Sequence, residues 1–264
     1  MTDVSERYVR YEVADGFATV TLDSPHNRNA ISARLVGELR RALADAAAND
    51  AVRAVVLTHT GSTFCAGADL SEAAATPDAD PAELAAQRTA QMTDLLREFL
   101  ELPKPIVARI DGHVRAGGMG LVGACDLVVA GPSSTFALTE ARLGLAASII
   151  SLTVLPRLTS RAAGRYFLTG EKFGPAQAEA IGLITAATED PGATVDELLA
   201  ALRQGSPQGL AESKKLTTMR LLADFDRDAA ELAAQSARLF GSEEAREGMT
   251  AFFEKRSPRW VRGE

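Results

Sequence analysis

The chain has 264 residues, of which 46% are hydrophobic and 24% are charged, and its formal net charge at pH 7 is -7. This length suits one large domain or a core with a small appendage, and the acidic balance provides no basic surface for nucleic acid or an acidic membrane. The first residues lack a secretory signal and the longest apolar region, 143–155, is too short to span a bilayer, so we expect a cytoplasmic protein.

The N-terminal part alternates strands with one helix. Residues 8–13 and 17–22 are predicted strands, and the Asp-Gly pair between them favours a hairpin. A helix is predicted from the N-cap Ser32 to Ala48, because its apolar residues recur at helical spacing. The nearly all-apolar run 51–58 predicts a strand that is buried on both faces, as in a βα crossover.

The middle of the chain leads into a second βα unit. Residues 61–70 are expected to be a loop, and the alanine- and aspartate-rich segment 72–80 is expected to be mobile. A helix is predicted over 81–102. The β-branched run 104–110, which contains Pro105, predicts a buried strand.

The second half begins with strands at 127–130 and 133–138, followed by a turn that carries the acid Glu140. A last strand is predicted at 183–187, and everything beyond residue 190 is helical. This change divides the chain into a core, 1–192, and a helical region, 193–264. The predicted helices of the second half are 148–158, 160–168, 175–181, 195–203, 208–223, 226–240 and 242–255.

A glycine-rich turn at residues 116–118 joins the strand region to a short apolar helix. Glycines at such a turn let a ligand approach the backbone, and the first amides of a helix lack intrahelical partners and carry partial positive charge. The turn therefore predicts a place to hold an oxygen that becomes negative during a reaction. A turn that serves packing alone is the alternative, and the similar small-residue turn at 66–68 weakens it.

The cysteines and histidines provide no further chemistry. Cys65 and Cys125 are expected to be reduced core thiols. The three histidines are scattered, so we expect no metal site, and His113 is expected to be structural.

Five cations also have structural interpretations. Arg115 and Arg142 are expected to form salt bridges rather than to contact an acidic substrate. Lys214, Lys215 and Arg220 are expected to lie on a solvated helix face.

Three segments in order, Phe64-Cys-Ala-Gly-Ala-Asp-Leu70, Ala116-Gly-Gly-Met-Gly-Leu121 and Cys125-Asp126, closely resemble the crotonase superfamily of enoyl-CoA hydratases and isomerases. The likeness runs from residue 25 to residue 255. It implies an α/β fold, with a crotonase-type ββα spiral core and a C-terminal helical region used in trimer assembly. The paired motifs are specific to the superfamily and much less specific to one reaction.

The resemblance also implies roles for individual residues. The backbone amides of Ala68 and Gly117 would form an oxyanion hole for the thioester carbonyl of an acyl-CoA, and Glu140 matches a catalytic glutamate. No cofactor would be needed beyond the CoA of the substrate, and the protein would be a homotrimer or a dimer of trimers. Residues implied to contact CoA are Ala66, Asp69, Leu70, Ser71 and Lys255, of which Asp69 has a structural alternative as a helix cap or loop-orienting group.

One position departs from the pattern of two-glutamate hydratases, which carry an acid where this chain has Gly120. We expect an enoyl-CoA hydratase, because the surrounding residues also resemble bacterial hydratases of branched or carboxylated substrates such as methylglutaconyl-CoA. The alternatives are a single-glutamate Δ3,Δ2-enoyl-CoA isomerase and a catalytically weak acyl-CoA-binding protein. A serine hydrolase is disfavoured, because no serine lies at the glycine-rich turn.

Overall fold

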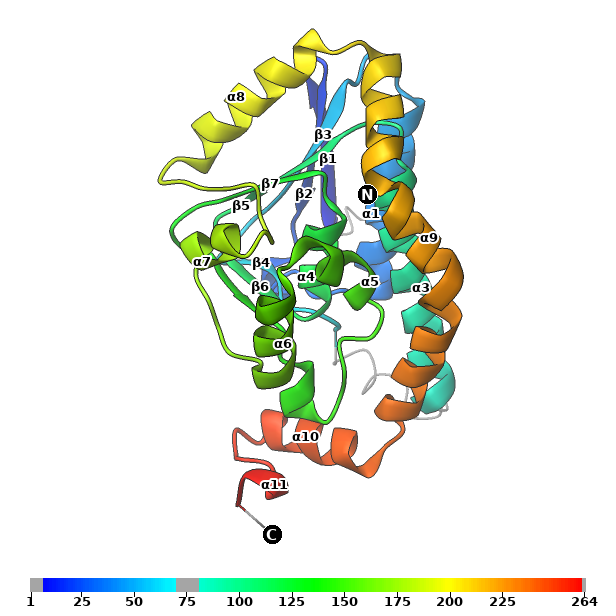
Figure 1. Ribbon diagram of the computed structural model, residues 1–264, viewed down its shortest axis with the longest axis vertical. Helices are drawn as coiled ribbons and strands as arrows, with labels where there is room; N and C mark the ends of the chain where they lie inside the picture. The colour runs from blue at the N-terminus through cyan, green and yellow to red at the C-terminus, as the bar shows by residue number, and fades with distance from the viewer. Residues whose placement is uncertain (1–6, 70–80, 263–264) are drawn as a thin grey trace, which may run out of the picture.

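Two β-sheets form the centre of the protein, and helices cover them, as the computed structural model in Figure 1 shows. The structure describes residues 7–69 and 81–262, so the segment 72–80, expected to be mobile, lies outside the described residues. No helix in the described part of the chain is long and apolar enough to cross a membrane.

The larger sheet has six strands in the order β1-β2-β3-β5-β7-β9, and the smaller has three in the order β4-β6-β8. Only β1 and β2 pair antiparallel, and every other pairing within these sheets is parallel. The predicted α/β class is therefore confirmed. The strands are β1 (Val9–Ala14), β2 (Phe17–Leu22), β3 (Ala54–His59), β4 (Thr63–Cys65), β5 (Ile106–Ile110), β6 (His113–Arg115), β7 (Leu127–Ala130), β8 (Thr135–Ala137) and β9 (Ala186–Ala187).

The predicted hairpin is present, because the turn residues adopt the backbone that a tight hairpin requires. Asp15 and Gly16 have φ angles of 51° and 81°, and Ala14 pairs with Phe17 across the turn. Positive φ at both central residues is the condition for a type I′ turn, which matches the twist of the flanking strands.

The smaller sheet contains two strands that the sequence pattern did not predict. β4 and β6 have three residues each, too few to show a period of two. β6 lies between the other two strands and pairs with both in parallel. This small sheet positions the candidate site.

Most predicted helices are present, with boundaries shifted by a few residues. The first helix, α1, begins after Ser32, whose hydroxyl accepts a hydrogen bond from the backbone N–H of Leu35 at 3.1 Å. The short element α11 was not predicted. The helices are α1 (Ala33–Ala48), α3 (Pro81–Glu101), α4 (Gly117–Ala124), α5 (Ser151–Val154), α6 (Ser160–Thr169), α7 (Pro175–Ala180), α8 (Pro191–Gln204), α9 (Pro207–Phe240), α10 (Glu243–Phe253) and α11 (Arg259–Arg262), with single 3₁₀ turns η1 (Pro25–Asn27), η2 (Glu140–Leu143) and η3 (Leu155–Arg157).

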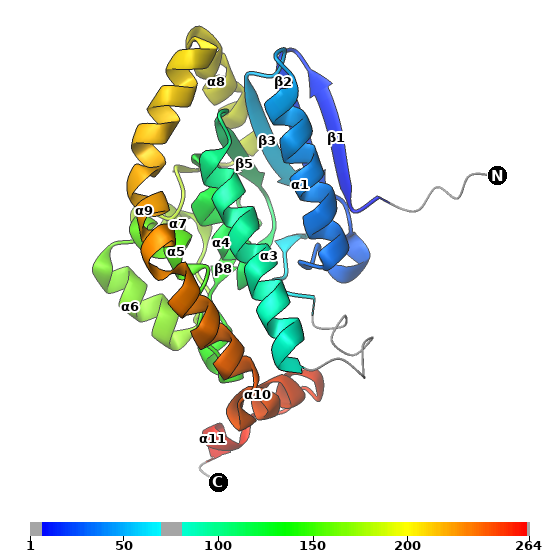
Figure 2. The same cartoon turned by 90° about the vertical axis from the view of Figure 1, so that its right-hand side faces the viewer.

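The prediction of two helices over 208–240 is wrong, because α9 is one continuous helix of 34 residues. No proline or glycine interrupts it near residue 225, and the intervening Phe225 is 1% exposed. Figure 2 shows α9 running beside α3, and the buried Thr89 and Ser236 hydroxyls lie 3.3 Å apart between them. The packing of α9 against α3 stabilises a continuous helix where the sequence alone suggested a break.

The expected solvated position of Lys214 is also wrong, because the side chain is buried and its surroundings are polar. Its ammonium lies 2.8 Å from the carboxylate of Asp126 and donates to the backbone carbonyl of Phe99 at 2.8 Å. Asp126 also accepts the backbone N–H of Ile106 at 2.7 Å. Burial lowers the pKa of Lys214, and the charge of Asp126 opposes that effect. The buried pair connects α9 to the entrance of β5.

Replacing Lys214 by methionine should lower the free energy of unfolding by about 3–5 kcal/mol, because it leaves the Asp126 carboxylate buried without its cation. Lys215→Met is the matched control, since that lysine is exposed and pairs with the exposed Glu212. The control should change stability by about 0.5 kcal/mol or less in chemical denaturation. Equal stabilities of the two variants would contradict a stabilising role for this pair.

Candidate active site

Three turns meet at one edge of the smaller sheet. The parallel strands β4, β6 and β8 all end at that edge, and each is followed by residues that the sequence analysis singled out. Ala68 lies three residues beyond β4, Gly117 two beyond β6 and Glu140 three beyond β8. The carboxyl ends of parallel strands are the usual place for ligands in α/β proteins.

The two glycine turns are in direct contact. A Cβ atom placed on Gly67 would lie 2.8 Å from the Cβ of Ala116 and 3.5 Å from the backbone nitrogen of Gly117. A Cβ placed on Gly117 would lie 4.0 Å from the backbone nitrogen of Ala68. Residues 68 and 117, distant in the sequence, therefore lie side by side as expected.

Within the described part of the chain, the backbone amides of Ala68 and Gly117 donate to no acceptor. The amide of Ile31 donates to the carbonyl of Gly67 at 2.8 Å, and its carbonyl accepts from the amide of Asp69 at 3.1 Å. These hydrogen bonds use the residues on either side of Ala68 and leave the amide of Ala68 itself out. Gly117 is the first residue of α4, where the amide has no intrahelical acceptor. These two N–H groups therefore remain free to bind a ligand, as far as residues 7–69 and 81–262 show.

Backbone strain accompanies the second turn. Ala116 has a φ of 45° and a ψ of -118°, a conformation that usually requires glycine. Its amide donates to the carbonyl of Ala137 at 3.2 Å, and its carbonyl accepts from Met119 at 2.8 Å. Such strain costs about 1–3 kcal/mol and persists only where the surroundings impose it, which is common at functional sites. No sequence pattern indicated this conformation.

The carboxyl group of Glu140 lies in a desolvated position. The residue as a whole is partly exposed, yet its Oε2 atom is buried and accepts no hydrogen bond from the described residues. Burial raises the pKa of Glu140 to about 7, although a hydrogen bond from its own backbone amide acts in the opposite direction. A carboxyl group that titrates near neutral pH suits proton transfer in either direction.

The space at Gly120 is filled by apolar side chains. A Cβ placed there would lie 2.6 Å from Cγ2 of Ile150 and 3.2 Å from Cε of Met92. The hydroxyl of Thr153 donates to the Gly120 carbonyl at 2.9 Å and fixes the backbone beneath. An acid at position 120 would not fit without rearrangement of Ile150, so Glu140 has no carboxylate partner from this position.

The structure describes some, but not all, of the residues implied to contact CoA. Ala66 is half-buried, and Asp69 accepts a hydrogen bond from the side-chain amide of Asn27 at 3.1 Å. Leu70 and Ser71 lie outside the described residues. Lys255 follows the end of α10, where it is exposed and has a φ of 53°.

The other polar candidates are structural. Arg115 donates to the backbone carbonyl and hydroxyl of Thr135 at 2.6 and 2.7 Å, and Arg142 donates to the carbonyl of Thr169 at 2.8 Å. The expectation of salt bridges for both arginines is therefore wrong among the described residues, since carbonyls rather than carboxylates take these bonds. His113 bonds the hydroxyl of Thr135 at 2.9 Å, as expected for a structural histidine.

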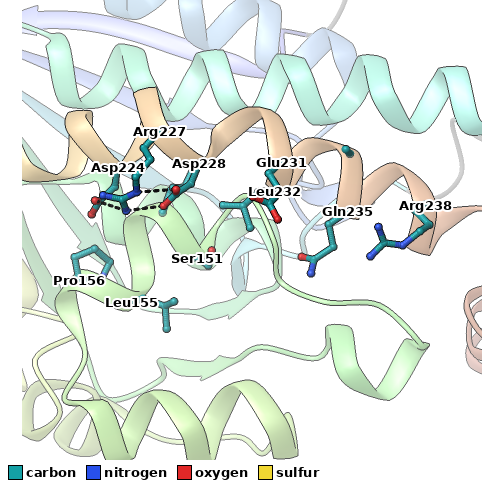
Figure 3. A pocket seen from close by; sticks show the side chains of 12 residues that line it. Ser151, Leu155, Pro156, Asp224, Arg227, Asp228, Glu231, Leu232, Gln235 and Arg238 are labelled. Atoms are coloured by element: carbon teal, nitrogen blue, oxygen red, sulfur yellow. Dashed lines mark hydrogen bonds and ion pairs between the residues drawn. The ribbon is translucent and has the colours of Figure 1, made fainter.

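A groove of about 540 Å³ lies elsewhere, between the start of α5 and the outer face of α9. Figure 3 shows Arg227 between Asp224 and Asp228, to which it is paired at 2.7 and 2.6 Å. None of Ala68, Gly117 and Glu140 lines this groove. Three of the five charged side chains that line the groove are thus paired with one another.

Within the described residues, two neighbouring amides without an acceptor and a desolvated acid follow the strands of one parallel sheet at the same edge, an arrangement that suits acyl-transfer or proton-transfer chemistry. The model of the enoyl-CoA hydratase/isomerase family matches residues 12–263. The chain therefore belongs to this family, within the crotonase superfamily, and is an enzyme of its lyase or isomerase type.

Individual relatives agree with this assignment. A putative enoyl-CoA hydratase from Thermus thermophilus is 35% identical over 92% of this chain and 96% of its own length. A mevalonyl-coenzyme A hydratase from Aspergillus fumigatus is 33% identical over 91% of this chain and 90% of its own. The crystal structure of a putative enoyl-CoA hydratase from Mycobacterium avium paratuberculosis is 58% identical, with a TM-score of 0.91 over 96% of this chain and 99% of that one.

The raised pKa of Glu140 predicts a pH-dependent effect on stability. Below the ordinary pKa of 4.5 the carboxyl is protonated in both states. As the pH rises towards 7 only the unfolded state ionises, so the wild type loses up to about 3 kcal/mol that it had at low pH. Glu140→Gln cannot lose this contribution. Its stability relative to wild type should therefore rise between pH 4 and pH 8, as measured by urea unfolding at each pH. A difference that stays constant with pH would contradict the desolvation of Glu140.

Proposed function

We propose that this protein is an enoyl-CoA hydratase, in which the amides of Ala68 and Gly117 hold the thioester oxygen and Glu140 transfers the proton. The proximity of these two amides, at the sheet edge where Glu140 follows β8, is the observation that carries the proposal. Donors fixed at the position of a developing oxyanion stabilise the transition state more than the ground state. One such donor is typically worth about 3 kcal/mol, so two supply a large part of the rate enhancement.

The reaction would proceed through an enolate. The Glu140 carboxylate removes a proton from water, and the water oxygen adds to the β-carbon of the enoyl group. The electrons of the carbon–carbon double bond then move onto the thioester oxygen, which Ala68 and Gly117 stabilise. The protonated Glu140 returns its proton to the α-carbon. Since one carboxyl both accepts and returns the proton, a pKa of about 7 is well suited to it.

The substrate we propose is a branched or carboxylated enoyl-CoA such as methylglutaconyl-CoA. The similarity to the protein named mevalonyl-coenzyme A hydratase supports an acyl group of this kind. We also propose that Ala66, Asp69, Leu70, Ser71 and Lys255 contact the CoA portion. The exposed Phe252 and Phe253 support the proposal that the helical region, 193–264, assembles trimers or pairs of trimers.

A second candidate is a Δ3,Δ2-enoyl-CoA isomerase, and the packing at Gly120 favours it. Ile150 occupies the space of a second acid, so position 120 supplies no carboxylate to help Glu140 place and activate water. An isomerase needs no water, because one carboxylate can take a proton from the α-carbon and return it to the γ-carbon. The name 1,2-epoxyphenylacetyl-CoA isomerase, carried by a relative 29% identical to this chain, supports isomerase chemistry.

A comparison of substrates separates the two reactions. Purified protein should hydrate crotonyl-CoA or methylglutaconyl-CoA, with products identified by chromatography and mass spectrometry, while a 3-enoyl-CoA tests isomerisation in parallel. Glu140→Gln should lower kcat by about 10²- to 10⁴-fold, because it removes the acid–base group, while acyl-CoA affinity is retained.

Isomerisation without any water addition would reject the hydratase and support the second candidate. Absence of turnover in the wild type, with acyl-CoA binding intact, would instead support the weak acyl-CoA-binding alternative. Full activity of Glu140→Gln would contradict both catalytic proposals.

A further inference from the structure

The turn that carries Glu140 is in backbone-to-backbone contact with helix α10. A Cβ placed on Gly248 would overlap the carbonyl oxygen of Leu143 and lie 2.5 Å from its carbonyl carbon. A Cβ placed on Gly144 would lie 2.6 Å from the carbonyl carbon of Glu244. We call this pair of contacts, Gly248 against Leu143 and Gly144 against Glu244, the glycine notch. It brings the C-terminal helix closer to η2 than any side chain would allow.

The notch is mechanically connected to Glu140 through a short closed turn. The carbonyl of Glu140 accepts the amide of Leu145 at 3.0 Å, so the residues between them form one ring that includes Gly144. On its other side the turn is tied to α6, because Arg142 donates to the carbonyl of Thr169. A shift of Gly144 away from α10 therefore moves the backbone of Glu140.

Helix α10 lies at the end of the molecule beneath α9, as Figure 1 shows. The hydroxyl of Ser242 caps its N-terminus by accepting the amide of Ala245 at 3.1 Å. From the middle of the helix, Glu247 is paired with Arg256 at 2.6 Å and accepts the amide of Arg259 at 2.9 Å, both in the segment beyond α10. These contacts stabilise α10 and the segment that follows it, and the turn rests against this helix at the notch.

We propose that α10 positions Glu140 through the glycine notch, with Gly248 as the positioning residue, and the inference rests on the acid–base role proposed for Glu140. A displaced turn would admit water to the carboxyl group and lower its pKa towards the ordinary value. It would also misplace the proton donor, and a displacement of about 1 Å can cost roughly 100-fold in rate.

Charged groups around the turn do not explain the raised pKa of Glu140, since burial is its cause. Among the described residues no charge is found to shift it. The charged residues of the turn and of the two helices packed on it are Arg142, Arg161, Arg165, Glu243, Glu244, Arg246 and Glu247. A change in packing at the notch is therefore expected to act on Glu140 through hydration rather than through a new charge.

Gly248→Ala tests the notch, with Gly37→Ala as the matched control. Both glycines lie inside helices, but a Cβ on Gly37 meets no atom within 4 Å. The control should keep wild-type kinetics. In Gly248→Ala we expect kcat to fall about 10- to 100-fold, with KM within about twofold. The pKa of Glu140, followed by NMR of carboxyl-labelled glutamate and assigned with Glu140→Gln, should fall by at least about half a unit.

An unchanged kcat and an unchanged pKa of Glu140 in Gly248→Ala would overturn the inference. A lower kcat with an unmoved pKa would overturn it too, because it would indicate only general damage. Should Gly248→Ala fail to fold, Glu247→Gln weakens the bonds that join α10 to the segment after it without filling the notch. That variant must lower the pKa of Glu140, and an unmoved pKa would overturn the inference.

The NMR measurement of the Glu140 pKa distinguishes a failure of the proposed function from a failure of the inference about α10. Full turnover of Glu140→Gln would defeat the proposed function whatever the notch does. If Glu140 is catalytic but its pKa does not change in Gly248→Ala, the inference about α10 fails and the proposed function stands.

Discussion

Contact between two glycine turns is the constraint on which the rest of the site depends. Gly67 and Gly117 approach so closely that a side chain on Gly67 would meet Ala116, and this approach brings the amides of Ala68 and Gly117 side by side. Two N–H groups held side by side before any substrate arrives are what the proposed oxyanion hole requires. A strained Ala116 is part of the arrangement, which indicates that the surrounding structure imposes the turn.

The remainder of the fold supports this contact from several directions. The smaller sheet places the two turns and Glu140 at one edge, because its strands are parallel and end together. Ile31, just before α1, holds the first turn by two backbone bonds on either side of Ala68. The buried pair of Lys214 and Asp126 ties α9 to the strands, and α10 closes on the turn that carries Glu140.

The sequence predicted those elements whose signals are local. The Asp-Gly hairpin, the Ser32 cap and the glycine-rich entrance to α4 each depend on a few neighbouring residues, and the structure confirms them. The resemblance to the crotonase superfamily supplied the pairing of Ala68 with Gly117, which no local pattern contains. β4 and β6 were missed because three residues show no period.

Features that depend on distant partners were not predictable. The continuity of α9 and the burial of Lys214 both follow from packing on segments more than 80 residues away. The glycine notch brings residues 143–144 against residues 244–248, and the sequence shows only two separate glycines there.

The most direct test of the central claim is a crystal structure with acetoacetyl-CoA, whose enolate form resembles the expected intermediate. The thioester oxygen should lie about 2.7–3.1 Å from the backbone nitrogens of both Ala68 and Gly117. A thioester oxygen bound beyond reach of either amide would contradict it.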